Sequence, residues 1–128
     1  MANTIFHIAL HVNERDVNSF YLDVLHGEIT GKFELSKEIS SEIFKINKSV
    51  NVVQVSCEEI DFELFIDDDP QLPTFAHVCF LSAQAKKIME RANQNGYHTY
   101  VRNNSSGTYF ISDANSNLFE IKTGKERS

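Results

Sequence analysis

The chain has 128 residues, of which 41% are hydrophobic and 23% are charged, so it has the length and composition of one ordinary globular domain. Its formal net charge of −6, with lysine and arginine scattered along the chain, excludes a nucleic-acid-binding protein, which needs a clustered basic surface. No apolar run reaches the roughly 20 residues that cross a bilayer, and the first residues carry no basic secretory leader. We therefore expect a single cytoplasmic domain over residues 1–128, with no nucleic-acid or membrane partner.

The first half of the chain alternates between strand-like and helix-like patterns. Residues 5–12 alternate between two faces, which is typical of a strand. Over residues 17–25 the apolar side chains recur at helical spacing, until Gly27 ends the pattern. The predicted strands lie at residues 4–13, 28–34, 50–57 and 60–66, and the last two form a hairpin. A helix is predicted at residues 14–26 and a short amphipathic helix at residues 35–46.

The strongest break in the chain is residues 67–73, which contain both prolines and an acidic run. The aspartates of this segment lack the alternating ligands and the distal glutamate of an EF-hand calcium loop. We interpret the segment as a solvated linker between two halves of the domain.

The second half repeats the plan of the first in a shorter form. A strand is followed by a helix that ends at Gly96, and three strands separated by turn-forming residues come next. These elements are predicted at residues 74–81, 83–95, 97–102, 107–112 and 117–122. We therefore divide the domain into module 1, residues 4–66, and module 2, residues 74–122.

The two modules carry the same pair of polar residues at matching places. His7 and His77 lie in the first strand of their modules, and Glu63 and Glu120 lie in the last. The pair in module 1 is 56 positions apart and the pair in module 2 is 43 apart, so module 1 carries 13 additional residues. The amphipathic segment 36–48 has this length, and we interpret it as an insertion packed over a sheet edge or across a cavity mouth.

Strand geometry places these four residues on equivalent faces. Alternate residues of a strand point to opposite sides of a sheet. If the apolar neighbours of these four residues pack against the helices, the four polar side chains project from the other side of each sheet. A carboxylate among Phe, Leu and Ile side chains is costly to bury unless it is paired or binds a cation. Two carboxylates, two neutral imidazoles and one divalent ion sum to zero charge, and this donor set suits zinc, nickel, cobalt, manganese or iron.

Each of these residues taken alone has a plainer explanation. A single histidine in a strand is usually a hydrogen-bonded core residue, and a single glutamate in a strand usually faces solvent. The repetition of both residues in register favours metal binding over these explanations. We therefore predict that His7, Glu63, His77 and Glu120 bind one divalent metal ion.

The two cysteines, Cys57 and Cys79, both lie in apolar strand-like runs. This placement predicts two buried, reduced thiols rather than a disulfide or a nucleophile. Reduced thiols agree with the expected cytoplasmic location.

The sequence resembles the vicinal oxygen chelate superfamily, which includes glyoxalases, bleomycin resistance proteins and extradiol dioxygenases. The resemblance runs from residue 5 to residue 122 and rests on an entry pattern and an exit pattern. The entry pattern consists of His7-Ile8-Ala9-Leu10, Phe20-Tyr21 and Leu25-His26-Gly27. The exit pattern consists of Gly107, Tyr109-Phe110-Ile111-Ser112-Asp113 and Glu120. The resemblance implies an α+β fold of two tandem βαβββ modules that form a partly open β-barrel around a metal site.

The resemblance also implies roles for particular residues. Glyoxalase I-like enzymes take one ligand from each of four strands, at positions that correspond to His7, Glu63, His77 and Glu120. The implied activity is that of a divalent-metal-dependent lyase or isomerase, which acts on a small vicinal-oxygen substrate through an enediolate-type intermediate. By this analogy Glu120 is the catalytic base and Glu63 lies opposite it. Strand alternation further predicts a substrate pocket lined by His11, Phe65, Cys79, Arg102 and Tyr109.

Other activities within the superfamily stay open. A bleomycin-resistance-like protein would bind an antibiotic without catalysis, although such members often lack the ligand set that is complete here. An acyl-CoA epimerase is a second alternative. A fosfomycin-resistance enzyme is a third, and it would use only three ligands, corresponding to His7, His77 and Glu120.

The expected partners follow from the same resemblance. Glutathione or another thiol is not supported as a co-substrate, because the arginine that glyoxalase I places four positions after its first ligand is His11 here. Members of the superfamily commonly dimerise, often with the cavity completed across the interface. We therefore expect a homodimer that binds a small-molecule substrate.

Overall fold

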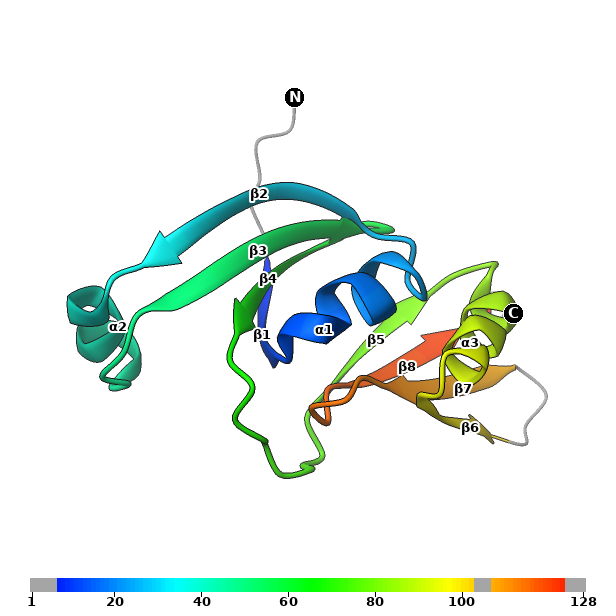
Figure 1. Ribbon diagram of the computed structural model, residues 1–128. Coiled ribbons are helices and arrows are strands. Elements are labelled where there is room, and N and C mark those ends of the chain that lie inside the picture. Colours follow the sequence, from blue (N-terminus) through cyan, green and yellow to red (C-terminus); the bar gives the residue numbers. More distant parts are fainter. Residues whose placement is uncertain (1–6, 103–106, 124–128) are drawn as a thin grey trace.

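The computed structural model describes residues 7–102 and 107–123, which contain two four-stranded β-sheets (Figure 1). The predicted strand residues 4–6 lie outside the described part of the chain. Module 1 forms β1 (Ile8–Val12), α1 (Glu14–Asp16), η1 (Val17–Leu22), β2 (Glu28–Leu35), α2 (Lys37–Phe44), β3 (Val50–Cys57) and β4 (Ile60–Ile66). Module 2 forms β5 (His77–Leu81), α3 (Ala85–Gln94), β6 (His98–Arg102), β7 (Thr108–Ser112) and β8 (Leu118–Lys122).

The two sheets have the same strand order, as the sequence repeat predicts. Module 1 is ordered β1-β4-β3-β2 and module 2 is ordered β5-β8-β7-β6. In each sheet the first strand pairs parallel to the last, and the other neighbours pair antiparallel. The α+β fold with two βαβββ modules is thus confirmed. The two sheets are separate and open, however, so one chain does not enclose the partly open barrel that the resemblance implied.

Module 1 differs from module 2 by α2, which lies between β2 and β3 at one end of the first sheet (Figure 1). The hydroxyl of Ser36 caps its start by accepting a hydrogen bond of 3.2 Å from the backbone amide of Ile39. Lys45 ends it in the left-handed conformation, with φ of 62°. The segment predicted as an insertion is therefore a helix with defined ends, joined to β3 by a short connection.

The helix predicted between Asn13 and Gly27 is present, but most of it is π-helical. The amide of Leu25, for example, donates a 3.0 Å hydrogen bond to the carbonyl of Phe20, five residues earlier. This wider turn brings the adjacent side chains of Phe20 and Tyr21 into the core, where neither is exposed. Apolar spacing alone predicts a helix here but does not distinguish the π form from the α form.

The core lies between the helix-bearing sides of the two sheets. The ring of Phe62 on β4 and the ring of Phe119 on β8 have centroids 5.9 Å apart, although they belong to different modules. Phe20 and Tyr21 of η1 contact Phe119 from the other side, with ring centroids 5.5 and 6.1 Å away. The two modules therefore share one aromatic core, with η1 packed between the sheets (Figure 1).

Partly buried polar bonds join the modules around this core. The hydroxyl of Tyr97 donates a 2.6 Å hydrogen bond to the buried carboxylate of Asp16. The guanidinium of Arg91 on α3 donates two hydrogen bonds, of 3.0 and 2.7 Å, to the carbonyl of Val24. These bonds hold the helix-bearing sides of the sheets together, so the opposite faces of both sheets point away from the shared core.

The linker between the modules has no regular secondary structure, as predicted, but it is bound rather than simply solvated. The amide of Gln71 donates a 2.8 Å hydrogen bond to the side chain of Asn115, and the Gln71 side chain bonds to the Asn115 carbonyl at 2.9 Å. Among the described residues, no helix has the length and apolar character needed to cross a membrane.

Candidate metal centre

The first predicted pair, His7 and Glu63, is formed on the outer face of the first sheet. His7 directly precedes β1, and Glu63 lies on β4, where its register partner is Ala9. The His7 Nε2 atom lies 3.3 Å from the Glu63 Oε1 atom. The second carboxylate oxygen of Glu63 accepts a 3.2 Å hydrogen bond from the side-chain amide of Gln54 on β3. Gln54 therefore orients the carboxylate and leaves Oε1 directed at the histidine.

The second pair, His77 and Glu120, occupies the equivalent place in module 2. The His77 Nε2 atom lies 3.1 Å from Oε1 of Glu120. Nδ1 of His77 lies 2.9 Å from the carbonyl oxygen of Phe75, and a carbonyl only accepts, so this nitrogen carries a proton. The bond to Phe75 is the largest cause of a raised pKa of His77, and the carboxylate of Glu120 raises that pKa further.

The hydrogen bond of His77 to a backbone carbonyl is the arrangement that commonly orients a histidine ligand of a metal ion. With Nδ1 bonded to Phe75, Nε2 is the nitrogen available to a ligand: it donates to Glu120 when the ring is protonated, and it can bind an ion in place of that proton. Separations of 3.1 and 3.3 Å within the two pairs suit neighbouring ligands of one ion, bonded at about 2.0–2.2 Å. The residues present therefore fit a divalent ion, as one histidine nitrogen and one carboxylate oxygen from each module.

The four side chains do not converge within one chain. Across residues 7–102 and 107–123, no group of three or more His, Cys, Asp and Glu side chains could hold an ion. The two pairs lie on different sheets, with Glu63 on β4 and Glu120 on β8, and neither pair gains a third ligand from the other. The sequence repeat thus gives two separate His–Glu pairs, where a single four-ligand cluster within one chain was expected.

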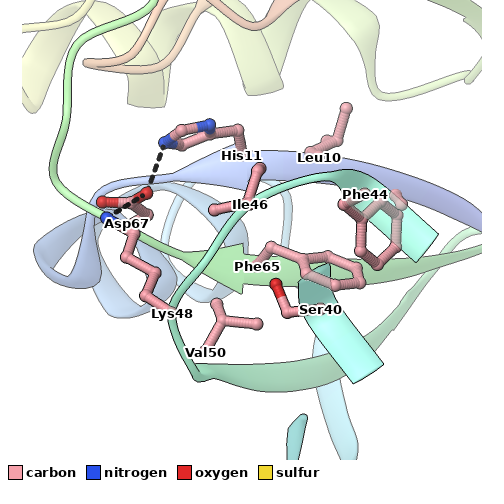
Figure 2. Close-up of a pocket in the computed structure, with 10 residues that line it drawn as sticks. Leu10, His11, Ser40, Phe44, Ile46, Lys48, Val50, Phe65 and Asp67 are labelled. Atoms are coloured by element: carbon pink, nitrogen blue, oxygen red, sulfur yellow. Dashed lines mark ion pairs between the residues drawn. The ribbon is translucent and has the colours of Figure 1, made fainter. Parts of the chain in front are cut away.

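Two of the five residues predicted to line a substrate pocket border a cavity beside the first pair. His11 and Phe65 are register partners on β1 and β4, on the same face as Glu63. Together with α2 they border a cavity of about 210 Å³ (Figure 2). Ala9, the register partner of Glu63, is part of the same wall, so the cavity begins next to the first pair.

The remaining predicted pocket residues lie in module 2. Cys79 is the register partner of Glu120, and its side chain is exposed. The expectation of a buried thiol is therefore wrong for Cys79. The reason is that no other described element covers this face of the sheet. Cys57 is buried as expected, and burial raises the pKa of its thiol to about 12. Arg102 is exposed at the end of β6.

Tyr109 does not lie on the His77–Glu120 face. Its register partner is Ile121, and it packs against the buried core cluster. The prediction that Tyr109 lines the pocket is therefore contradicted, because adjacent residues of a strand face opposite sides and Phe110, not Tyr109, is the neighbour of Glu120.

Sequence reasoning missed two parts of the candidate site. Gln54 is not next to any ligand in the sequence, and only its register with Glu63 in the hairpin of β3 and β4 could have indicated it. Phe44 of α2 was missed because the position of an inserted helix over a sheet is not visible in local patterns. Its ring contacts Phe65 with a centroid separation of 5.4 Å.

Comparisons with known proteins agree with this architecture. No protein-family model matches the chain, and no curated protein sequence is similar to it. Solved structures do match. A variant of the fosfomycin resistance protein FosX from Listeria monocytogenes, complexed with Mn(II) and 1S,2S-dihydroxypropylphosphonic acid, is similar with a TM-score of 0.72 and 19% identity, covering 98% of this chain and 95% of that one.

Two further structures come from other organisms. FosX from Mesorhizobium loti has a TM-score of 0.69 at 15% identity and covers 98% of this chain and 94% of its own. A glyoxalase family protein from Enterococcus faecalis has a TM-score of 0.68 at 18% identity, with 93% and 96% covered. These neighbours are members of the vicinal oxygen chelate superfamily. At this level of identity the likeness concerns the fold, and this chain has the fold of the vicinal oxygen chelate superfamily.

Proposed function

We propose that the protein is a divalent-metal-dependent enzyme of the glyoxalase-like lyase or isomerase type, acting on a small molecule with two vicinal oxygens. The observation that carries the proposal is the pair of His–Glu contacts at equivalent positions of the two sheets, His7 with Glu63 and His77 with Glu120. Each contact brings an imidazole nitrogen next to a carboxylate oxygen, and each glutamate lies between apolar residues of its strand.

We further propose that the complete centre forms between two copies of the chain. In one chain the two His–Glu pairs, which we call half-sites, lie on different sheets and form no group of three or more ligands among the described residues. In a homodimer with two-fold symmetry, the His7–Glu63 face of one copy would meet the His77–Glu120 face of the other, and symmetry would produce two such centres. Four donors would then surround each ion, with zero net charge from two carboxylates and two neutral imidazoles.

The residues of this centre suit proton transfer between adjacent carbons of a substrate. A divalent ion supplies Lewis-acid stabilisation of developing negative charge on the substrate oxygens. Glu120 would accept the proton from one carbon, and Glu63, on the opposite side of the centre, would hold or return a proton at the neighbouring carbon. Gln54 would keep Glu63 in place by its hydrogen bond to the second carboxylate oxygen.

A second candidate function is the opening of the epoxide of fosfomycin, and the FosX neighbours favour it. A phosphonate needs cationic partners. Lys122, whose ammonium lies 3.7 Å from Glu120, and Arg102 on β6 are the groups of module 2 that could provide them. Consumption of fosfomycin, followed by phosphorus NMR, separates this reaction from isomerisation of hemithioacetals or epimerisation of acyl-CoA thioesters.

A complementation experiment tests the shared centre. One chain carries His7→Ala with Glu63→Gln, and a differently tagged chain carries His77→Ala with Glu120→Gln. Each variant alone contains no intact four-donor set, but the co-expressed heterodimer contains one. We expect each homodimer to lose tight cobalt binding and the purified heterodimer to regain one cobalt ion per two chains, measured by absorption of bound Co²⁺ and by metal analysis.

Two results would contradict the proposal. A heterodimer that binds cobalt no more tightly than the two homodimers would show that the half-sites do not combine between chains. Wild-type protein that binds no divalent ion, or that shows no turnover of any of the three substrate classes when loaded, would rule out a metal-dependent enzyme of this type.

A further inference from the structure

The cavity beside the first half-site has properties that the proposed reaction does not itself require. It lies between α2 and the outer face of β1, β3 and β4, and its volume is about 210 Å³ (Figure 2). Most of its wall is apolar and comes from Leu10, Phe44, Ile46, Val50 and Phe65. An apolar cavity of about 150 Å³ is large enough to bind benzene, so this one accommodates an aromatic ring with a few further atoms.

One end of this cavity is polar. Lys48 places its ammonium 2.9 Å from the carboxylate of Asp67 and 3.4 Å from that of Asp69. His11 Nε2 lies 3.6 Å from the Asp67 carboxylate, beyond hydrogen-bond distance. Two carboxylates thus surround one ammonium group, so this end disfavours a further anion and suits a neutral group such as a hydroxyl.

The position of the cavity connects it to the half-site. Ala9 is part of its wall and is also the register partner of Glu63. Phe65 is two residues from Glu63 on the same strand and on the same face, a distance of about 7 Å along the strand. A molecule whose oxygens bind an ion held by His7 and Glu63 would therefore extend its substituent into the cavity.

The size of the cavity can be compared with the apolar part of a molecule bound by one structural neighbour. The molecule in one FosX structure, 1S,2S-dihydroxypropylphosphonic acid, has only a methyl group as its apolar part. A methyl group would leave most of a 210 Å³ cavity unfilled. We propose that the cavity binds an aromatic or similarly large apolar substituent of the substrate, ending in a neutral polar group, and that α2 provides its specificity. This inference rests on the proposed metal centre only for the position of the reacting oxygens.

A pair of hydroxamates tests the inference on the cobalt-loaded protein. Acetohydroxamate and benzohydroxamate present the same two vicinal oxygens, and they differ by a methyl against a phenyl group. We expect benzohydroxamate to bind at least about ten-fold more tightly, because the phenyl group is removed from water in the cavity. The absorption of bound Co²⁺ reports binding of both compounds.

Two variants and a control locate the preference. Phe44→Ala removes one wall of the cavity, and Ala9→Leu fills part of its volume. Each is expected to reduce the preference for benzohydroxamate to less than about three-fold. Phe44→Ala, which is on α2 and not beside Glu63, should do so while acetohydroxamate binding stays unchanged. Ile43→Ala is the matched control, because Ile43 lies on the same helix, is 61% exposed and is not part of the cavity wall, so the preference should persist.

A metal-independent measurement keeps the two proposals distinguishable. Metal-free, ¹⁵N-labelled protein is titrated with benzyl alcohol, toluene and benzoate. We expect amide shifts centred on Ser40, Ile46 and Phe65 for benzyl alcohol, weaker effects for benzoate because of Asp67 and Asp69, and no such effects in Ala9→Leu.

Two outcomes distinguish an error in the metal centre from an error in the cavity assignment. If neither hydroxamate binds but benzyl alcohol binds at the cavity, the metal centre is wrong and the cavity assignment stands. If both hydroxamates bind equally, or if benzyl alcohol produces the same shifts in Ala9→Leu as in the unmodified protein, the cavity assignment is overturned and the metal centre stands.

Discussion

The hydroxyl of Tyr21, on η1 of module 1, donates a 2.7 Å hydrogen bond to Oδ2 of Asp113, which lies 92 positions later at the end of β7. Both side chains are buried, and the other oxygen of Asp113 accepts hydrogen bonds of 2.9 Å from the backbone amides of Asn115 and Asn117. Burial and then the charge of Asp113 raise the pKa of Tyr21 far above its usual range, so the phenol stays protonated and continues to donate. This bond joins η1 of module 1 to the turn that follows β7 of module 2.

Replacement of Tyr21 by phenylalanine removes this bond and leaves the ring packing in place. We expect the free energy of unfolding to fall by about 1–3 kcal/mol, since a buried carboxylate loses one of its donors. Urea denaturation followed by circular dichroism measures the change. Tyr100→Phe is the matched control, because Tyr100 is 61% exposed and its replacement should alter stability by less than about 0.5 kcal/mol. Equal effects of the two substitutions would contradict a structural role for the bond between the modules.

Phe119→Ala tests whether the two modules share one core. The ring of Phe119 contacts residues of both modules, and it is fully buried. We expect a loss of about 3–5 kcal/mol in the free energy of unfolding. The same substitution at Phe75, which is 99% exposed, provides the control and should have little effect. A small effect at Phe119, or two separate unfolding transitions in the unmodified protein, would indicate that the modules fold independently.

Metal affinity should depend on a carboxylate from each module. We expect Glu63→Gln and Glu120→Gln each to weaken binding of Co²⁺ by about 10–100-fold, as is typical of changes at metal-site residues. Isothermal titration calorimetry on metal-free protein measures the affinity. Glu59→Gln, at an exposed residue of the turn between β3 and β4, is the matched control. If the control weakens binding as much as the other two variants, the ion does not use the predicted carboxylates.

The cluster at the polar end of the cavity predicts a pH dependence of stability. Burial opposes ionisation of Asp67, but the hydrogen bonds from Lys48 and from the Asp69 amide outweigh it and lower the pKa of Asp67. Because the folded-state pKa is below that of the unfolded chain, the group stabilises the fold above its unfolded pKa of about 3.9. This contribution is lost as the pH falls through the lowered value.

Lys48→Met should raise the pKa of Asp67 and make stability less dependent on pH in this acidic range. Carbon-13 NMR of the Asp67 carboxyl gives its titration, and urea denaturation between about pH 2.5 and pH 6 gives the stability. Lys32→Met on β2 controls for the loss of one positive charge. An unchanged Asp67 titration in Lys48→Met would show that the ion pair does not cause the lowered pKa.

Much of the fold could be predicted because its signals are local. The hairpin of β3 and β4 has the predicted bounds, since alternating apolar residues flank a turn at Glu58 and Glu59. The linker was visible from its prolines. The π-helical form of η1 was not predictable, because it depends on both Phe20 and Tyr21 finding space in a core that includes the second module.

The candidate site could be predicted in the same partial way. The partners within each pair, such as His77 and Glu120, follow from the strand pattern, and the structure brings each pair together. His11 and Phe65 border the cavity beside the first pair, whereas Tyr109 packs against the core, because Phe110 and not Tyr109 is the neighbour of Glu120. The cavity under α2 was not predictable, because it depends on where the inserted helix packs.

The sequence by itself determined the two repeated modules, the order of their elements along the chain, and the His–Glu pair within each module. These properties follow from the period of a strand, which is local. Only the tertiary structure decided that the two His–Glu pairs form no common cluster within the described part of one chain. That result depends on how the two modules pack, through contacts such as those between Phe62 and Phe119 and between Tyr21 and Asp113, which are distant in the sequence.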